Sequence, residues 1–120
     1  MADHLPKFKP GQAVTFTADE AIAGGQVVEV GAANRSVKVA GAASAKAIGT
    51  AGFSAQTGDQ VTVHLPGPVD TAKAAAAIVR GAKVEAGAAG TVQTATTGLV
   101  LGIALTAAAA AGDIVEFVRA

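Results

Sequence analysis

The chain has 120 residues, with nine basic and nine acidic residues and no cysteine. The resulting net charge of zero argues against a strongly basic nucleic-acid surface, and the lack of cysteine excludes disulfides and thiolate metal sites. The core must be built mostly from small side chains, because there are 31 Ala and 15 Val but only 4 Phe and no Trp or Tyr. Such a core buries little apolar area, so we expect the subunit to gain stability by packing against copies of itself.

Residues 1–10 are expected to form an extended N-terminal arm ahead of a single β domain over residues 11–120. Proline holds the backbone extended at two positions, and two lysines flank the one aromatic residue and make the arm locally basic. A disordered terminus is the common fate of such a segment, and the alternative is a strap that anchors on a partner. The arm residues expected to make that contact are Leu5, Pro6, Lys7, Phe8, Lys9 and Pro10.

The arm lacks the apolar run of a secretory signal, and no stretch of the chain has the apolar length needed to span a bilayer. We therefore expect a protein made in the cytoplasm, with no membrane partner and no nucleic-acid partner.

Alternating and β-branched stretches bounded by turn residues predict ten strands. In the first half they are residues 12–17, 26–30, 35–40, 46–53 and 60–65, and in the second half 69–73, 82–86, 91–95, 99–106 and 113–118. Residues 74–80 are predicted as a loop or a short helical turn, because a run of Ala favours helix but Gly81 follows within about two turns. The pattern predicts an all-β fold, a small β-sandwich or a barrel.

Two similar halves, residues 11–65 and 67–118, share the order and spacing of many residues. Most of these are Gly, which turns select in any case, so chance competes with duplication; the near-constant spacing favours duplication. Pro66-Gly67-Pro68 would then mark a junction inside one domain. Pairs separated by 56 positions are Gly11 and Gly67, Ile22 and Ile78, Gly25 and Gly81, Glu29 and Glu85, and Gly31 and Gly87.

A Gly-Asp pair stands at the turn of one predicted hairpin in each half, Gly58-Asp59 in the first and Gly112-Asp113 in the second. Gly accepts positive φ, and Asp bonds to nearby backbone, so a turn role outweighs a catalytic carboxylate pair.

No other residues form a catalytic or ligand-binding pattern. Glu29 and Glu85 occupy matching strand positions and are expected to face solvent, as is His64, for which a metal site shared with Asp59 is the weaker reading. The sequence has no serine nucleophile elbow and no phosphate-binding glycine loop. We therefore expect no enzyme activity, no cofactor and no metal.

Several Gly- and aliphatic-rich segments nevertheless follow a recognisable order: residues 10–18, 22–28, 48–51, 78–84, 101–105 and 112–118. In this order the chain resembles the capsid decoration, or cement, proteins of tailed-phage heads, over nearly all of residues 10–118. Members of that family commonly carry an aromatic residue in the strand after the second glycine, whereas Lys83-Val84-Glu85 has none.

The resemblance implies a non-enzymatic β-rich protein on the outer capsid surface of the virion, typically a homotrimer over three-fold positions. It would bridge neighbouring subunits of the major capsid protein, with the arm as a capsid or neighbour contact, and many copies would multiply a modest affinity. Two other functions stay open. One is a small-molecule or glycan-binding β module with a pocket between the halves, although the lack of Trp and Tyr argues against a glycan. The other is an enzyme whose site needs a partner chain.

Overall fold

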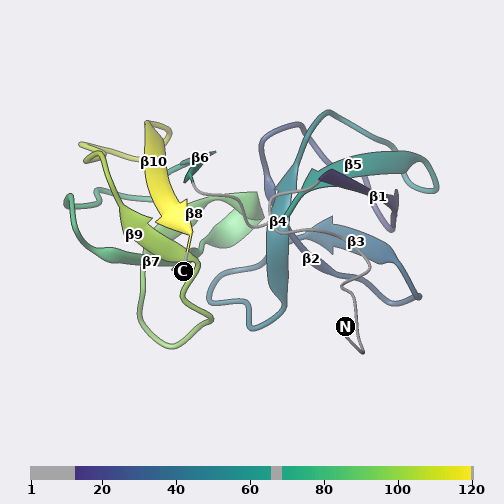
Figure 1. Cartoon of the computed structure of the whole chain (residues 1–120), viewed down its shortest axis with the longest axis horizontal. Helices are drawn as coiled ribbons and strands as arrows, with labels where there is room; N and C mark the ends of the chain where they lie inside the picture. The colour runs from purple at the N-terminus through teal and green to yellow at the C-terminus, as the bar shows by residue number, and fades with distance from the viewer. Residues whose placement is uncertain (1–12, 66–68, 120) are drawn as a thin grey trace, which may run out of the picture.

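The computed structural model describes residues 13–65 and 69–119 and is built from β-strands in both halves (Figure 1). The first half forms a closed barrel and the second a five-stranded sheet. This confirms the predicted all-β fold of two similar halves, with a barrel in the first half only. The barrel strands are β1 (Ala13–Ala18), β2 (Val27–Val30), β3 (Ser36–Val39), β4 (Ala47–Ala51) and β5 (Gln60–His64). The sheet strands are β6 (Val69–Lys73), β7 (Lys83–Ala86), β8 (Val92–Thr94), β9 (Gly102–Ala104) and β10 (Ile114–Arg119).

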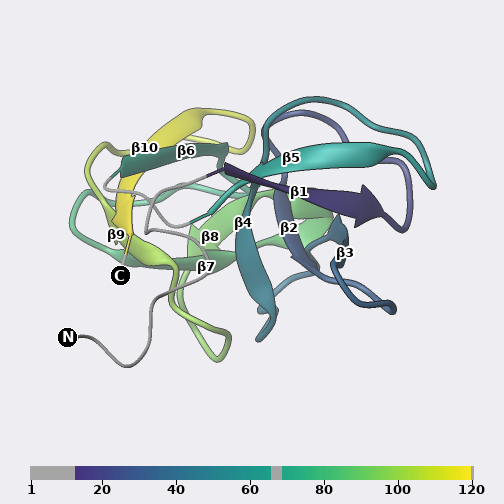
Figure 2. The same cartoon turned by 45° about the vertical axis from the view of Figure 1, so that its right-hand side comes forward.

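The two halves repeat one strand order. It runs β3-β2-β4-β5-β1 around the barrel and β8-β7-β9-β10-β6 across the sheet, so every strand has its counterpart five places later. Figure 2 shows two equivalent pairs, β1 with β5 and β6 with β10, along the upper edge of the molecule. Smaller features are repeated too: Ile22 and Ile78 are both buried and each forms an isolated antiparallel bridge. Gly25 and Gly81 both have positive φ, 88° and 86°.

Two clusters of buried side chains fill the molecule. One lies within the barrel and includes Val28, Val37, Val61 and Val63. The other fills the sheet half around Phe117, and it also contains Val27, Ala40 and Ala47 from the first half. Since the second core is completed by residues of the first half, we propose that the two halves form one domain.

The expectation that Glu85 faces solvent is wrong, because its side chain is fully buried. Its carboxylate accepts hydrogen bonds from Thr96 N at 2.9 Å, Gln93 Nε2 at 2.6 Å, Gly98 N at 2.8 Å and Thr96 Oγ1 at 3.0 Å. The Thr96 backbone bond first, and then the others, lower the pKa of Glu85 to about 2 although burial acts in the opposite direction. The ionised carboxylate thus holds the loop between β8 and β9.

The same expectation is wrong for Glu29, which is buried at the matching position of the first half. Gly41 N donates to its carboxylate at 3.2 Å, and the Nζ atoms of Lys38 and Lys46 lie 3.8 and 3.9 Å away. Burial raises the pKa of Glu29, but hydrogen bonds from Ser44 and Gly41 and the two lysine charges outweigh it, so the pKa is lowered. Each glutamate therefore fixes the loop after the third strand of its half. The two loops, after β3 and after β8, lie next to each other at the lower edge in Figure 1.

One predicted strand differs from the structure because of tertiary pairing. Strand β9 is shorter than predicted, because Gly98 N is held by Glu85 and Leu99 N donates to Ser44 O at 3.2 Å. Residues 74–80 form a loop, which is one of the two forms predicted for them. This loop is fixed at its start, where Ala74 makes a parallel bridge to Val92 and Ala75 N donates to Val92 O at 2.7 Å.

We expect Phe117→Ala to lower the free energy of unfolding by about 3–5 kcal/mol, because Phe117 is the largest fully buried side chain among the described residues and its truncation leaves a cavity. Phe53→Ala is the matched control, since Phe53 is 50% exposed and its truncation should cost less than about 1 kcal/mol. Urea unfolding of both variants measures the difference. Equal losses would contradict the assignment of Phe117 as the centre of the second core.

We expect Glu85→Gln to reduce the pH dependence of stability in acid. A carboxylate whose pKa falls from 4.5 to about 2 on folding contributes stability that is complete above pH 4.5 and is lost as the pH falls toward 2. The variant should be less stable than the wild type at neutral pH, and its stability should fall less between those two values. Thermal unfolding across this range measures the effect, with the exposed Glu20→Gln as control. An unchanged slope in Glu85→Gln would contradict it.

Candidate functional site

The two halves differ at the seam between their first and third strands. In the barrel, β1 and β3 run parallel and pair at Thr17 with Ser36 and at Ala18 with Val37, and Thr17 N donates to Arg35 O at 2.9 Å. In the second half, β6 and β8 do not pair within the described part of the chain. A single bridge between Ala74, just beyond the end of β6, and Val92 remains. Strand β6 is therefore an edge strand, whereas β1 is paired on both sides.

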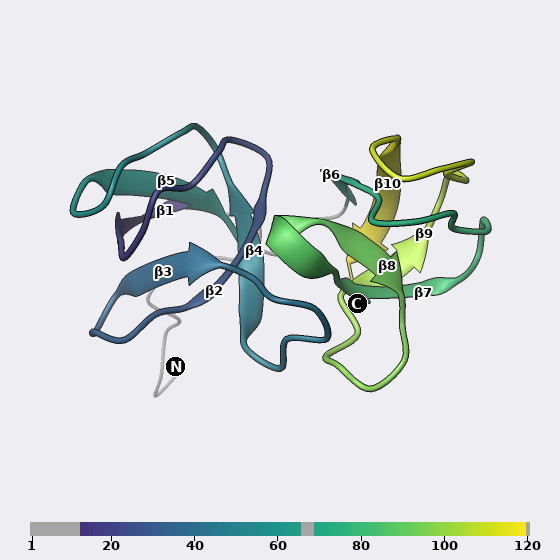
Figure 3. The same ribbon diagram turned by 180° about the vertical axis from the view of Figure 1, so that it is seen from behind.

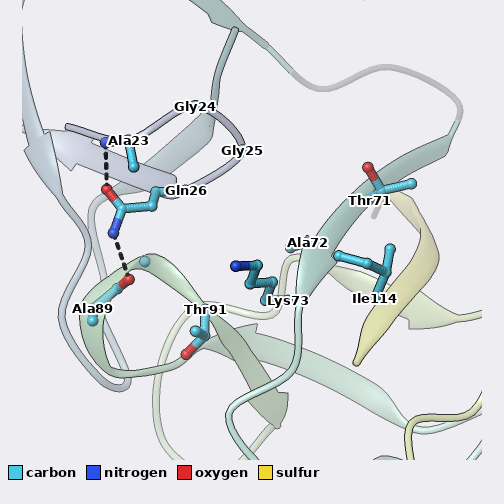
Figure 4. A pocket seen from close by; sticks show the side chains of 11 residues that line it. Ala23, Gly24, Gly25, Gln26, Thr71, Ala72, Lys73, Ala89, Thr91 and Ile114 are labelled. Carbon is cyan, nitrogen blue, oxygen red and sulfur yellow. Dashed lines mark hydrogen bonds between the residues drawn. The ribbon is translucent and has the colours of Figure 1, made fainter. Parts of the chain in front are cut away.

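A pocket of about 330 Å³ lies at this open seam, between the two halves (Figure 4). Residues 71–73 of β6, with Ile114 of the neighbouring strand, form one wall. The opposite wall is formed by residues 89–91 and by the loop 23–26 of the barrel half. The walls are mostly Gly and Ala, so a guest can approach the backbone closely.

Gln26 fixes the wall that faces β6. Its Oε1 accepts from Ala23 N at 2.8 Å and its Nε2 donates to Ala89 O at 2.9 Å, so one side chain ties the two halves together. The short 3₁₀ turn η1 (Ala88–Gly90) is also held to the barrel by the bond from Gly90 N to Ala40 O at 3.1 Å. Gly90 has φ of 75°, and a Cβ there would lie 2.6 Å from Gln26 Cβ. Figure 3 shows this turn between the two halves from behind.

The other wall presents backbone polar groups and one cation. Ala74 N donates to Asp113 O at 2.8 Å, and residues alternate along an antiparallel pair, so the N–H and C=O groups of Thr71 and Lys73 point away from β10. Thr71 N donates to the neighbouring Asp70 Oδ1, at 3.0 Å. The Lys73 side chain extends into the pocket in Figure 4, and within residues 13–65 and 69–119 it forms no ion pair.

An exposed apolar row crosses the outer face of the same sheet. Val69, Val118 and Ile103 are direct partners across β6, β10 and β9, and they are 50%, 36% and 43% exposed. Three adjacent apolar side chains on one face form a surface suited to contact with another protein.

The predicted site residues occupy different places. The arm contacts Leu5, Pro6, Lys7, Phe8, Lys9 and Pro10 lie outside the described residues. Gly58 and Gly112 have φ of 87° and 92°. Asp59 Oδ2 accepts from Gln56 N at 3.1 Å, and Asp113 Oδ2 accepts from Ala109 N and Ala110 N at 3.0 and 3.2 Å. None of these four residues lines the pocket.

The arrangement is suited to binding. Among the residues that the structure describes, no three His, Cys, Asp or Glu side chains come together as metal ligands, and no helix has the length and apolarity to cross a membrane. His64 is exposed. The two buried glutamates are fixed by loop donors and do not line the pocket.

The open seam was not predicted from the sequence, although the length of one turn indicated it. The turn that joins the second and third strands closes with a bond from Gly31 N to Ser36 O in the first half and from Gly87 N to Thr91 O in the second. It is therefore one residue shorter in the second half, at the place where the seam opens.

Comparisons with known proteins agree with this fold. The family model described as "Phage cement protein" matches residues 8–119. The fold is similar to that of the head fiber gp8.5 N base of bacteriophage phi29, with a TM-score of 0.74 at 18% identity over 91% of this chain and 93% of that one. No curated protein matches the sequence. The family resemblance and the expected virion localisation are thereby confirmed. The chain belongs to the phage cement protein family and is a structural component of the virion associated with the capsid.

Proposed function

We propose that this protein binds the outer surface of a phage head and stabilises the shell by bridging neighbouring subunits of the major capsid protein. The observation that carries the proposal is the cement-protein match over residues 8–119, which leaves little of the chain for a separate function. Bridging requires exposed adhesive surface, which the row of Val69, Val118 and Ile103 supplies. Apolar area buried across a joint between shell subunits opposes the internal pressure that would open that joint.

The protein acts as a homotrimer in this proposal. Two features support self-association: the core is composed mainly of Val and Ala, and large apolar side chains remain exposed on the sheet half. A trimer presents three copies of each shell contact, so a weak contact per copy yields stable attachment through avidity.

The arm, Leu5 to Pro10, is the proposed anchor on the shell or on a neighbouring copy. It precedes β1, whose first residue Ala13 pairs with His64 near the junction of the two halves. Phe8 and Leu5 would supply apolar contact, and the two lysines would favour an acidic surface.

A small-molecule binding module is the second candidate, and the pocket between the halves is the observation that favours it. The volume of about 330 Å³ is at the lower end for ligand sites. Its lining includes no aromatic ring and few polar side chains, which provides little basis for recognising a small ligand.

The direct test mixes the purified protein with undecorated heads of its own phage and counts bound copies by electron microscopy. We expect saturable decoration at positions that join shell subunits, and raised resistance of the heads to heat. Light scattering should give three times the 11.5 kDa chain mass. Heads that remain bare at saturating protein would reject capsid binding, and a monomer at high concentration would reject the trimer.

Deletion of residues 2–9 tests the arm separately. We expect the variant to keep the wild-type circular dichroism and unfolding midpoint, because the described fold begins at β1, and to occupy fewer sites on the heads. A second variant, Phe8→Ala, isolates the aromatic anchor from the rest of the arm. Equal occupancy by the deletion variant and the wild type would rule out the arm as a shell contact.

A further inference from the structure

We propose that the open edge of β6 receives an extended segment of the shell subunit, which adds a strand beside β6 and places an acidic side chain near Lys73. This inference rests on the proposed capsid binding and names the contact through which it occurs.

Backbone groups provide the first argument. A strand edge with outward N–H and C=O groups is a template for another strand, and recognition by strand addition uses such an edge. On β6, Thr71 and Lys73 present these groups to the pocket. In residues 13–65 and 69–119, Lys73 N–H points away from β10 and donates to no loop or turn carbonyl.

The first half shows how the seam looks when it is filled. Thr17, the counterpart of Lys73, donates its N–H to Arg35 O, and β3 continues alongside β1. In the second half, the equivalent bond is missing and the pocket occupies the space. An added strand would restore to β6 the pairing that β1 already has.

The pocket walls admit a backbone. Gly24 and Gly25 of the barrel loop face β6 across the pocket, and neither carries a side chain that would block a guest. Gln26 and Gly90 keep that wall in place through bonds to the opposite half, so the pocket is formed before the guest arrives. A preformed edge reduces the ordering cost of binding.

The positive charge of Lys73 favours an acidic segment as the added strand. Lys73 extends into the pocket and forms no ion pair with any described residue, so a carboxylate on the guest would be attracted there. The arm of this chain is a poorer guest, because Lys7 and Lys9 would bring like charge to Lys73 and its prolines lack N–H donors. A shell segment that contains Asp or Glu and has backbone N–H donors would meet both the charge requirement and the hydrogen-bonding requirement.

The test uses undecorated heads and paired variants. Thr71→Pro removes the N–H that faces the pocket, together with its bond to Asp70 Oδ1, and leaves the pairing of β6 with β10 intact. Its matched control is Thr15→Pro, which makes the same change at the equivalent position of β1, outside the pocket. Lys73→Glu reverses the charge and Lys73→Arg retains it; both keep the backbone, so they give a result even if the proline variant fails to fold.

We expect Thr71→Pro and Lys73→Glu to bind heads about tenfold more weakly or worse, and Thr15→Pro and Lys73→Arg to bind like the wild type. Full binding to heads by Lys73→Glu, or by a folded Thr71→Pro, would overturn the inference and leave capsid binding standing. Wild-type protein that does not bind heads would overturn both. Images of decorated heads identify the guest: a shell strand beside β6 supports the inference, and the arm of another copy there overturns it.

Discussion

The whole structure depends on how the edges of its strands are satisfied. Each half arranges five strands in one order, and that order brings the first and third strands to the two ends of the sheet. Closure then requires these two to pair. In the first half they do, at Thr17 and Ala18, and a barrel results. In the second half, the bridge at Ala74 is the remnant of that closure in the described chain, and β6 keeps an open edge. One topology therefore yields a closed barrel and an open seam.

Two buried glutamates show how a repeated device adapts to its surroundings. Both occupy the same place in the second strand of a half, and both fix the loop after the third strand. Glu85 uses uncharged donors on residues 93, 96 and 98, whereas Glu29 also has two lysines near it. Since a buried carboxylate is tolerated only when donors surround it, these loops are held in defined conformations. The loops touch each other near Ala43 and Gly98, where a Cβ on the glycine would lie 2.6 Å from the Ala43 backbone, and so help join the halves.

The features of the described residues agree with a structural role. The shifted carboxylates are used for loop structure, while the exposed features, the apolar row and the β6 edge, lie side by side on one sheet. Both involve β6, so one partner could cover them together. A core made of Val and Ala gives a thin subunit whose remaining apolar surface is available for contacts with other proteins. The membership of the chain in the phage cement protein family agrees with a structural role.

The sequence by itself determined the ten strand positions to within a few residues, the two similar halves and the Gly-Asp turns, because alternation and turn chemistry are local properties. It also indicated the family, since the order of glycines follows the order of turns. It did not determine the burial of Glu29 and Glu85, the short β9 or the open seam. Those depend on which loop donors meet a carboxylate and on a turn one residue shorter after Gly87, and these are contacts between segments far apart along the chain. Only the tertiary structure decides such contacts, because the partners of the backbone groups and charges in each half come from elements that are distant in the sequence.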